Sequence, residues 1–166
     1  MLHEEPAVWQ EANSSRRGHG ARCAEKEETS MLKFATTLAR QTGDYILARS
    51  SSQFAIEHKG RIDLVTEVDK AAQERIVSAI EKRYPDHGIL AEEGYHKDSG
   101  SGYTWIIDPL DGTTNFVHRL PVYAVSLALY REGKPIVGVC YNPAADELFA
   151  AETGKGSTRN GTPISV

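Results

Sequence analysis

The segment TWIIDPLDGTTNF, residues 104–116, joins a short apolar run to a cluster of acidic and hydroxyl side chains. The apolar residues Trp105–Ile107 predict a short strand that ends at Asp108. Pro109 restricts the backbone directly after that strand, and Asp111 returns a second carboxylate three residues after the first. Carboxylate and backbone oxygens are the ligands that hard divalent cations such as Mg²⁺ prefer, so the segment predicts a divalent-metal site.

Two further observations bear on this interpretation. Asp-Pro-x-Asp-Gly is also a good surface turn, and a turn without chemistry remains an alternative for the segment. A second apolar run, Gly88–Ala91, likewise ends in acids, Glu92 and Glu93, and two acid-bearing strand ends favour one shared acidic site. After Asp111, the residues Gly112 and Thr113 predict a turn or helix start whose N–H groups are free to meet phosphate oxygens.

The flanking sequence predicts an α+β fold. Helical spacing indicates one helix from Thr29 or Ser30 to about Ile46 and a second over residues 66–84, stopped by Pro85. At the start of the second helix, spacing alone favours a capping role for Thr66 and Asp69. Strands are then expected over 122–130, 136–141 and 147–151, followed by a hairpin at Asn160-Gly161. Helices followed by antiparallel hairpins favour a layered α+β arrangement over a doubly wound parallel sheet.

Composition excludes several classes of protein. The 166 residues fit one domain, and the formal net charge of −4 argues against a binder of nucleic acid or of anionic membrane surfaces. No apolar run is long enough for a membrane helix. Two cysteines form no disulfide framework, which favours a reducing, cytoplasmic location, and Cys140 is expected in the core. Residues 1–30 are poor in apolar side chains and predict a disordered extension to a domain of residues 31–166.

Three motifs in order resemble the inositol monophosphatase family. They are Asp63-Leu64-Val65-Thr66 with Asp69, then Tyr84-Pro85-Asp86-His87 with Glu92-Glu93, then Trp105 to Phe116. The resemblance runs from about Met31 to the last residue. It implies a layered α/β/α/β/α sandwich of the sugar-phosphatase type, Mg²⁺-dependent hydrolysis of a small phosphate monoester such as inositol 1-phosphate, inhibition by lithium, and a homodimer.

The resemblance also implies roles for individual residues. Glu92 would bind the first metal ion and the attacking water, and Asp108 would bridge two ions. The Leu110 carbonyl would be a further metal ligand, and Asp111 would bind the second ion. Thr113, assisted by Asp69, would orient that water and help to deprotonate it. The substrate and its phosphate would be bound by Asp111, Gly112, Thr113 and Thr114.

The sequence departs from the family pattern in its length. Family chains continue past the Asn160-Gly161 hairpin into a second αβ portion, which supplies another metal-binding Asp, so we expect the present sequence to cover the N-terminal portion only. One alternative function is therefore a metal- and phosphate-binding fragment without activity, and another is a phosphatase for a different sugar phosphate such as fructose 1,6-bisphosphate. The aspartyl-phosphate mechanism of haloacid-dehalogenase phosphatases is disfavoured, because two residues separate Asp108 from Asp111 where that motif has one.

Overall fold

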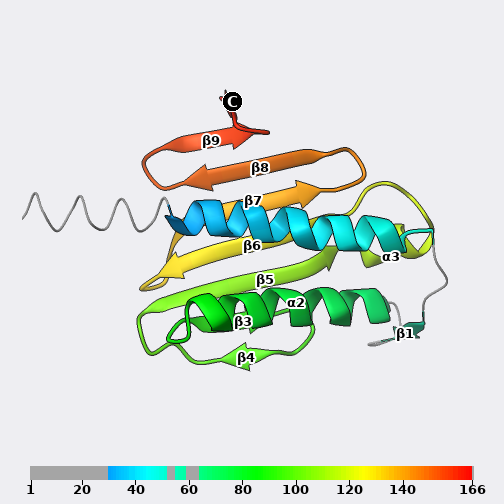
Figure 1. Cartoon of the computed structure of the whole chain (residues 1–166), viewed down its shortest axis with the longest axis horizontal. Coiled ribbons are helices and arrows are strands. Elements are labelled where there is room, and N and C mark those ends of the chain that lie inside the picture. The colour runs from blue at the N-terminus through cyan, green and yellow to red at the C-terminus, as the bar shows by residue number, and fades with distance from the viewer. Residues whose placement is uncertain (1–29, 52–54, 59–63, 166) are drawn as a thin grey trace, which may run out of the picture.

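One eight-stranded sheet and two long helices dominate the computed structural model, which describes residues 30–51, 55–58 and 64–165. The first helix covers residues 30–49, and α2 covers Glu67–Arg83. Both helices cross in front of the sheet in Figure 1, and both contribute to one apolar core with the sheet residues beneath them. The α+β class expected from the sequence is confirmed.

The sheet is a meander with one parallel addition. Its order is β10-β9-β8-β7-β6-β5-β3-β4, and every neighbouring pair is antiparallel except β3 and β5, which run parallel. The strands are β3 (Gly88–Ala91), β4 (His96–Lys97), β5 (Tyr103–Asp111), β6 (Ala124–Arg131), β7 (Lys134–Asn142), β8 (Glu147–Glu152), β9 (Gly156–Arg159) and β10 (Thr162–Ile164). A separate antiparallel pair joins β1 (Ile56–His58) to β2 (Leu64–Thr66).

The start of α2 follows the predicted capping pattern. The Thr66 side chain accepts hydrogen bonds from the backbone N–H groups of Val68 and Asp69, and the Asp69 carboxylate accepts one from the Thr66 N–H. This capping box satisfies N–H groups that have no partner inside the helix. The other end of α2 stops at Tyr84, directly before Pro85, as the sequence predicts.

β5 is longer than the sequence predicts. We expected the strand to end at Asp108, but it continues through Pro109 and Leu110 to Asp111. Its register with β6 shifts between Asp108 and Asp111, so the missing N–H of Pro109 falls in an irregular part of the ladder and removes no regular hydrogen bond. A short helix, α3 (Thr113–Val117), follows the turn at Gly112.

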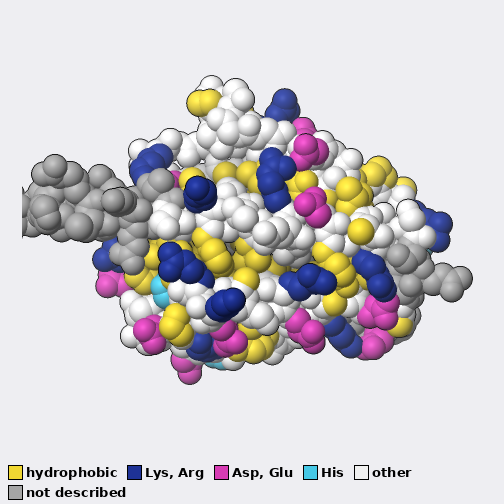
Figure 2. All heavy atoms as spheres, in the orientation of Figure 1, with side chains coloured by type: hydrophobic (Ala, Val, Ile, Leu, Met, Phe, Trp, Pro, Cys, Tyr) yellow, Lys and Arg dark blue, Asp and Glu magenta, His cyan; other side chains and the backbone are white. Residues whose placement is uncertain are grey.

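The two faces of the sheet differ in cover. Residues facing the helices, such as Trp105, Ile107 and Leu127, are buried, and Figure 2 shows Lys, Arg, Asp and Glu side chains spread over the outside of the helix layer. On the opposite face, Leu90, Ile106 and Phe149 expose 49%, 39% and 39% of their surface. We call this opposite surface the bare face.

The bare face corrects one expectation about the core. Cys140 was expected to be buried because it lies inside a strand, but the structure exposes it. It alternates along β7 with the buried residues Val139 and Tyr141, so its side chain points to the bare face.

Two further expectations concern the N-terminal extension and membrane-spanning helices. The extension predicted over residues 1–30 lies outside the described residues, apart from Ser30 at the start of the first helix. Among the described residues, neither the first helix nor α2 nor α3 has the length and apolar character needed to cross a membrane.

Candidate active site

The ends of β3 and β5 bring two predicted site residues together. Because these strands are parallel neighbours, their carboxyl ends meet at one edge of the sheet, and the Glu92 N–H donates to the Ile107 carbonyl at 3.0 Å. The Glu92 and Asp108 carboxyl groups share a hydrogen bond. Two carboxyl groups in contact form such a bond only when one of them carries a proton. The repulsion between two ionised carboxylates at this distance favours that protonated state.

The surroundings of Asp108 raise its pKa. Burial, the hydrogen bond and negative charge of Glu92, and the charge of Asp111 together raise the pKa of Asp108 to about 7. The Leu110 N–H opposes this rise, because it donates to Asp108 Oδ1 at 3.1 Å. A bound cation would replace the proton that holds the two carboxyl groups together.

Asp69 and Thr113 form the second part of the site. Thr113 Oγ1 donates to Asp69 Oδ1 at 2.7 Å, and the Thr66 N–H donates to Asp69 Oδ2 at 2.8 Å. The carboxylate therefore caps α2 with one oxygen and holds Thr113 with the other. The two roles that the sequence left as alternatives for Asp69, capping and contact with Thr113, are both present in the structure.

The remaining predicted residues surround this contact. The Leu110 side chain is buried and its carbonyl oxygen lies 3.1 Å from Thr113 Oγ1. Asp111 and Thr114 are exposed, at the end of β5 and in α3. Gly112 adopts φ +90°, and a Cβ there would lie 3.0 Å from the Val122 carbonyl oxygen, so the position requires glycine.

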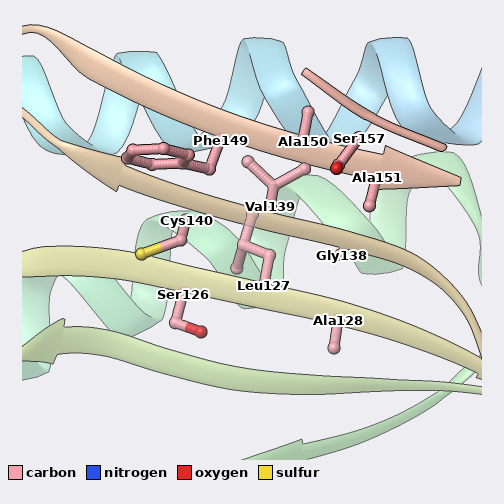
Figure 3. A pocket seen from close by; sticks show the side chains of 10 residues that line it. All are labelled: Ser126, Leu127, Ala128, Gly138, Val139, Cys140, Phe149, Ala150, Ala151 and Ser157. Carbon is pink, nitrogen blue, oxygen red and sulfur yellow. The ribbon is translucent and has the colours of Figure 1, made fainter. Parts of the chain in front are cut away.

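A shallow trough leads from the acidic residues across the bare face. Asp108 pairs with Ser126, Ser126 with Cys140, and Cys140 with Phe149, so one row of side chains crosses four strands. Figure 3 shows the Ser126, Cys140 and Phe149 side chains of this row. A hollow of about 400 Å³ lies beside Glu92 and Asp108, and another of about 290 Å³ lies beside Asp111 and Gly112. The site is thus open to small molecules from the side of the sheet that the described helices leave uncovered.

Cys140 lies in this row but lacks the character of a nucleophile. Burial and the negative charges of Asp111 and Asp108 raise the pKa of its thiol, so the protonated form is favoured.

Comparison with known proteins identifies the family to which this fold belongs. The model of the inositol monophosphatase family matches residues 27–166, which include every element described above. The chain belongs to the inositol monophosphatase family.

Relatives in this family are similar in sequence and in structure. The chain is 45% identical over 139 residues to inositol monophosphatase 3 of Solanum lycopersicum, covering 81% of this chain and 52% of that protein. It is 45% identical over 134 residues to the Nus factor SuhB of Escherichia coli, covering 79% and 50%. The Thermotoga maritima IMPase superposes with a TM-score of 0.78 at 40% identity, over 82% of this chain and 54% of that one. The chain therefore spans about half the length of the curated relatives that it matches.

The residues present fit the divalent metal that this family implies. The candidate donors are the carboxylates of Glu92, Asp108 and Asp111 and the Leu110 carbonyl, an all-oxygen set of the kind that Mg²⁺ prefers. Among the described residues, no three acidic, histidine or cysteine side chains already converge on one point. The Glu92–Asp108 pair is assembled, whereas Asp111 acts on Asp108 through its charge.

Sequence reasoning missed one residue that contacts this site. The Gln73 side chain in α2 forms hydrogen bonds with both backbone groups of Glu93. A signal for it existed, because Gln73 follows Asp69 by four residues and so lies on the same face of a predicted helix.

Proposed function

We propose that this chain carries the site of a Mg²⁺-dependent phosphate-monoester hydrolase that acts on inositol 1-phosphate. The observation that carries the proposal is the contact between Glu92 and Asp108 at the shared edge of β3 and β5. Two carboxyl groups in contact repel each other when both are ionised, and a bound divalent cation removes this repulsion. The Thr113–Asp69 hydrogen bond is connected to the pair through Leu110, which contacts Asp108 with its N–H and Thr113 with its carbonyl oxygen.

The metal ligands in this proposal are Glu92, Asp108, the Leu110 carbonyl and Asp111. Mg²⁺ bound there supplies a Lewis acid, which lowers the pKa of water and neutralises charge on the phosphoryl oxygens. The carboxylates of Glu92 and Asp108 lie on neighbouring strands, so the sheet itself sets their separation.

Thr113 has the geometry to orient the attacking water. Its hydroxyl proton is donated to Asp69, so the oxygen lone pairs remain to accept a hydrogen bond from water. Asp69 is held in place by the Thr66 N–H and receives the proton from the Thr113 side. Direct attack by water leaves no covalent phosphoenzyme.

Substrate binding is assigned to the turn between β5 and α3. The N–H groups of Gly112 and Thr113, with Thr114, would donate to the phosphate oxygens. Asp111 and the backbone of Gly112 would meet the hydroxyl groups of the substrate, because they line the hollow of about 290 Å³ at the end of β5.

The substrate class rests on sequence and on relatives. Residues 114–118, Thr-Asn-Phe-Val-His, resemble the inositol branch of the family. Solved relatives include a Staphylococcus aureus IMPase-II with bound inositol monophosphate, the same protein with bound 2'AMP, and an IMPase/NADP phosphatase complexed with NADP and Ca²⁺. Inositol 1-phosphate is therefore the first substrate to assay, with 2'-AMP, NADP and fructose 1,6-bisphosphate as alternatives.

A second candidate function is binding of metal and phosphate without turnover. The observation that favours it is that, among the described residues, no three acidic, histidine or cysteine side chains converge on one point. The homodimer implied by the family resemblance stays a prediction.

Phosphate release from inositol 1-phosphate in the presence of Mg²⁺ tests the proposal. We expect Thr113→Val to lower kcat by about 10²-fold or more, because it keeps the shape of the side chain and removes the hydroxyl that orients water. Thr104→Val makes the same change at the other end of β5 and should leave kcat unchanged.

Each outcome of this assay has one meaning. Mg²⁺ binding without release of phosphate from any of the four substrates supports the second candidate function. Turnover that is equal in the wild type and in Thr113→Val contradicts the proposed role of Thr113.

A further inference from the structure

Glu92 lies in a tight turn that follows β3. The Gly94 N–H donates to the Ala91 carbonyl at 3.2 Å, which closes a four-residue turn with Glu92 and Glu93 at its centre. Glu92 itself is exposed, so packing does little to fix its side chain. The backbone of Glu92 is held by its own hydrogen bond to Ile107 and by the hydrogen bonds of the next residue, Glu93.

Gln73 holds Glu93 through both of its backbone groups. The Glu93 N–H donates to Gln73 Oε1 at 3.0 Å, and Gln73 Nε2 donates to the Glu93 carbonyl at 3.4 Å. A primary amide can do this because it carries a donor and an acceptor on one planar group. The side chain thus acts on the turn as a neighbouring strand would.

The position of Gln73 ties this turn to the rest of the site. Gln73 lies one helical turn after Asp69, on the same side of α2. Through Asp69 the helix contacts Thr113, and through Gln73 it contacts the turn that bears Glu92. One rigid helix therefore sets the distance between the residues that orient water and the first proposed metal ligand.

We propose that Gln73 is a positioning residue that holds Glu92 in place to bind the divalent cation together with Asp108. This inference rests on the proposed function, because it assigns Gln73 a role in that same metal site. Partners that orient metal ligands typically change metal affinity by about 10- to 100-fold when they are removed.

The test compares Gln73→Met with Gln41→Met in the full chain. Methionine has nearly the length and helix propensity of glutamine but cannot form either hydrogen bond. Gln41 is exposed on the first helix, so Gln41→Met controls for the substitution itself. The measurements are the Kd for Mg²⁺ by calorimetric titration and hydrogen exchange at the Glu93 amide by NMR.

We expect Gln73→Met to raise the Kd for Mg²⁺ about tenfold or more and to speed exchange at the Glu93 amide. Gln41→Met should match the wild type in both measurements. A Gln73→Met variant with the wild-type Kd, or with unchanged exchange at Glu93, overturns the inference alone. A wild-type chain that binds no Mg²⁺ overturns the proposed function as well, so the two failures are distinguishable.

Discussion

At the scale of single residues, the candidate site depends on side chains that serve two purposes. Asp69 is predictable as a helix cap from the Thr66-x-x-Asp69 spacing, and the structure confirms that role. Its contact with Thr113 spans 44 positions in sequence, so no local pattern contains it. The contact with Thr113 was expected only from the family resemblance. The structure shows how one side chain serves both roles, because Asp69 caps the helix with one carboxylate oxygen and accepts from Thr113 with the other.

Asp108 leads to a prediction about stability and pH. Its pKa is raised from 3.8 to about 7 on folding, so between these values the folded chain keeps a proton that the unfolded chain has released. The free energy of unfolding of the metal-free protein should therefore fall as the pH rises from about 4 to about 7. Asp108→Asn removes this penalty, and we expect it to stabilise the metal-free chain at pH 8 by about 1–2 kcal/mol after allowance for partial exposure.

Urea unfolding in EDTA at pH 4 and pH 8 measures this effect. At pH 4 the Asp108 side chain is protonated in the folded chain and, because the pH is close to the unfolded pKa of 3.8, partly protonated in the unfolded chain, so wild type and variant should differ little there. An equal difference at the two pH values would show that the carboxyl group is not the cause.

At the scale of elements, the sequence predicts the two long helices and most of the sheet but misses where β5 ends. The strand was expected to end at Asp108, where the apolar run stops, and the next residue, Pro109, cannot donate to a ladder. The structure places it at a register shift, where no regular donor is required. β4 was not predicted, since two residues are too few to form a pattern.

The docking of the first helix depends on Gly43. A Cβ at this position would lie 2.5 Å from Cδ1 of the buried Tyr141 ring, and no real contact is that short. Alanine is favoured over glycine in an open helix by about 1 kcal/mol, whereas overpacking a core typically costs about 1–3 kcal/mol. We expect Gly43→Ala to lower the free energy of unfolding by about 1 kcal/mol, measured by urea denaturation, and a gain in stability would show that the helix docks less closely.

At the scale of the whole molecule, the described helices cover one face of the sheet and leave the other bare. Alternation along a strand shows which residues share a face, but it does not show which face is covered, and this is why Cys140 was wrongly expected in the core. Large apolar side chains remain exposed at Leu90, Ile106 and Phe149. Apolar surface of this kind binds apolar molecules when it is left in water.

Two neighbouring isoleucines in β5 test this difference between the faces. Ile106 exposes 39% of its surface and Ile107 exposes 2%. We expect Ile106→Thr to change the free energy of unfolding by less than about 0.5 kcal/mol and to reduce the fluorescence of a bound apolar dye. Ile107→Thr should cost about 2 kcal/mol or more, because it buries a hydroxyl in the core. Equal costs for the two variants would contradict the assignment of a bare face.

The side-chain contacts of the candidate site have a consequence for how the chain folds. From β5 to β10 each strand pairs with its neighbour in sequence, so those contacts close short loops. The contacts of the site span more chain, namely 20 positions from Gln73 to Glu93 and 44 from Asp69 to Thr113. Closing longer loops costs more entropy, which places assembly of the site late in folding relative to the meander. Binding of a cation at Glu92 and Asp108 would then report that α2 has docked on the sheet, and not only that the sheet has formed.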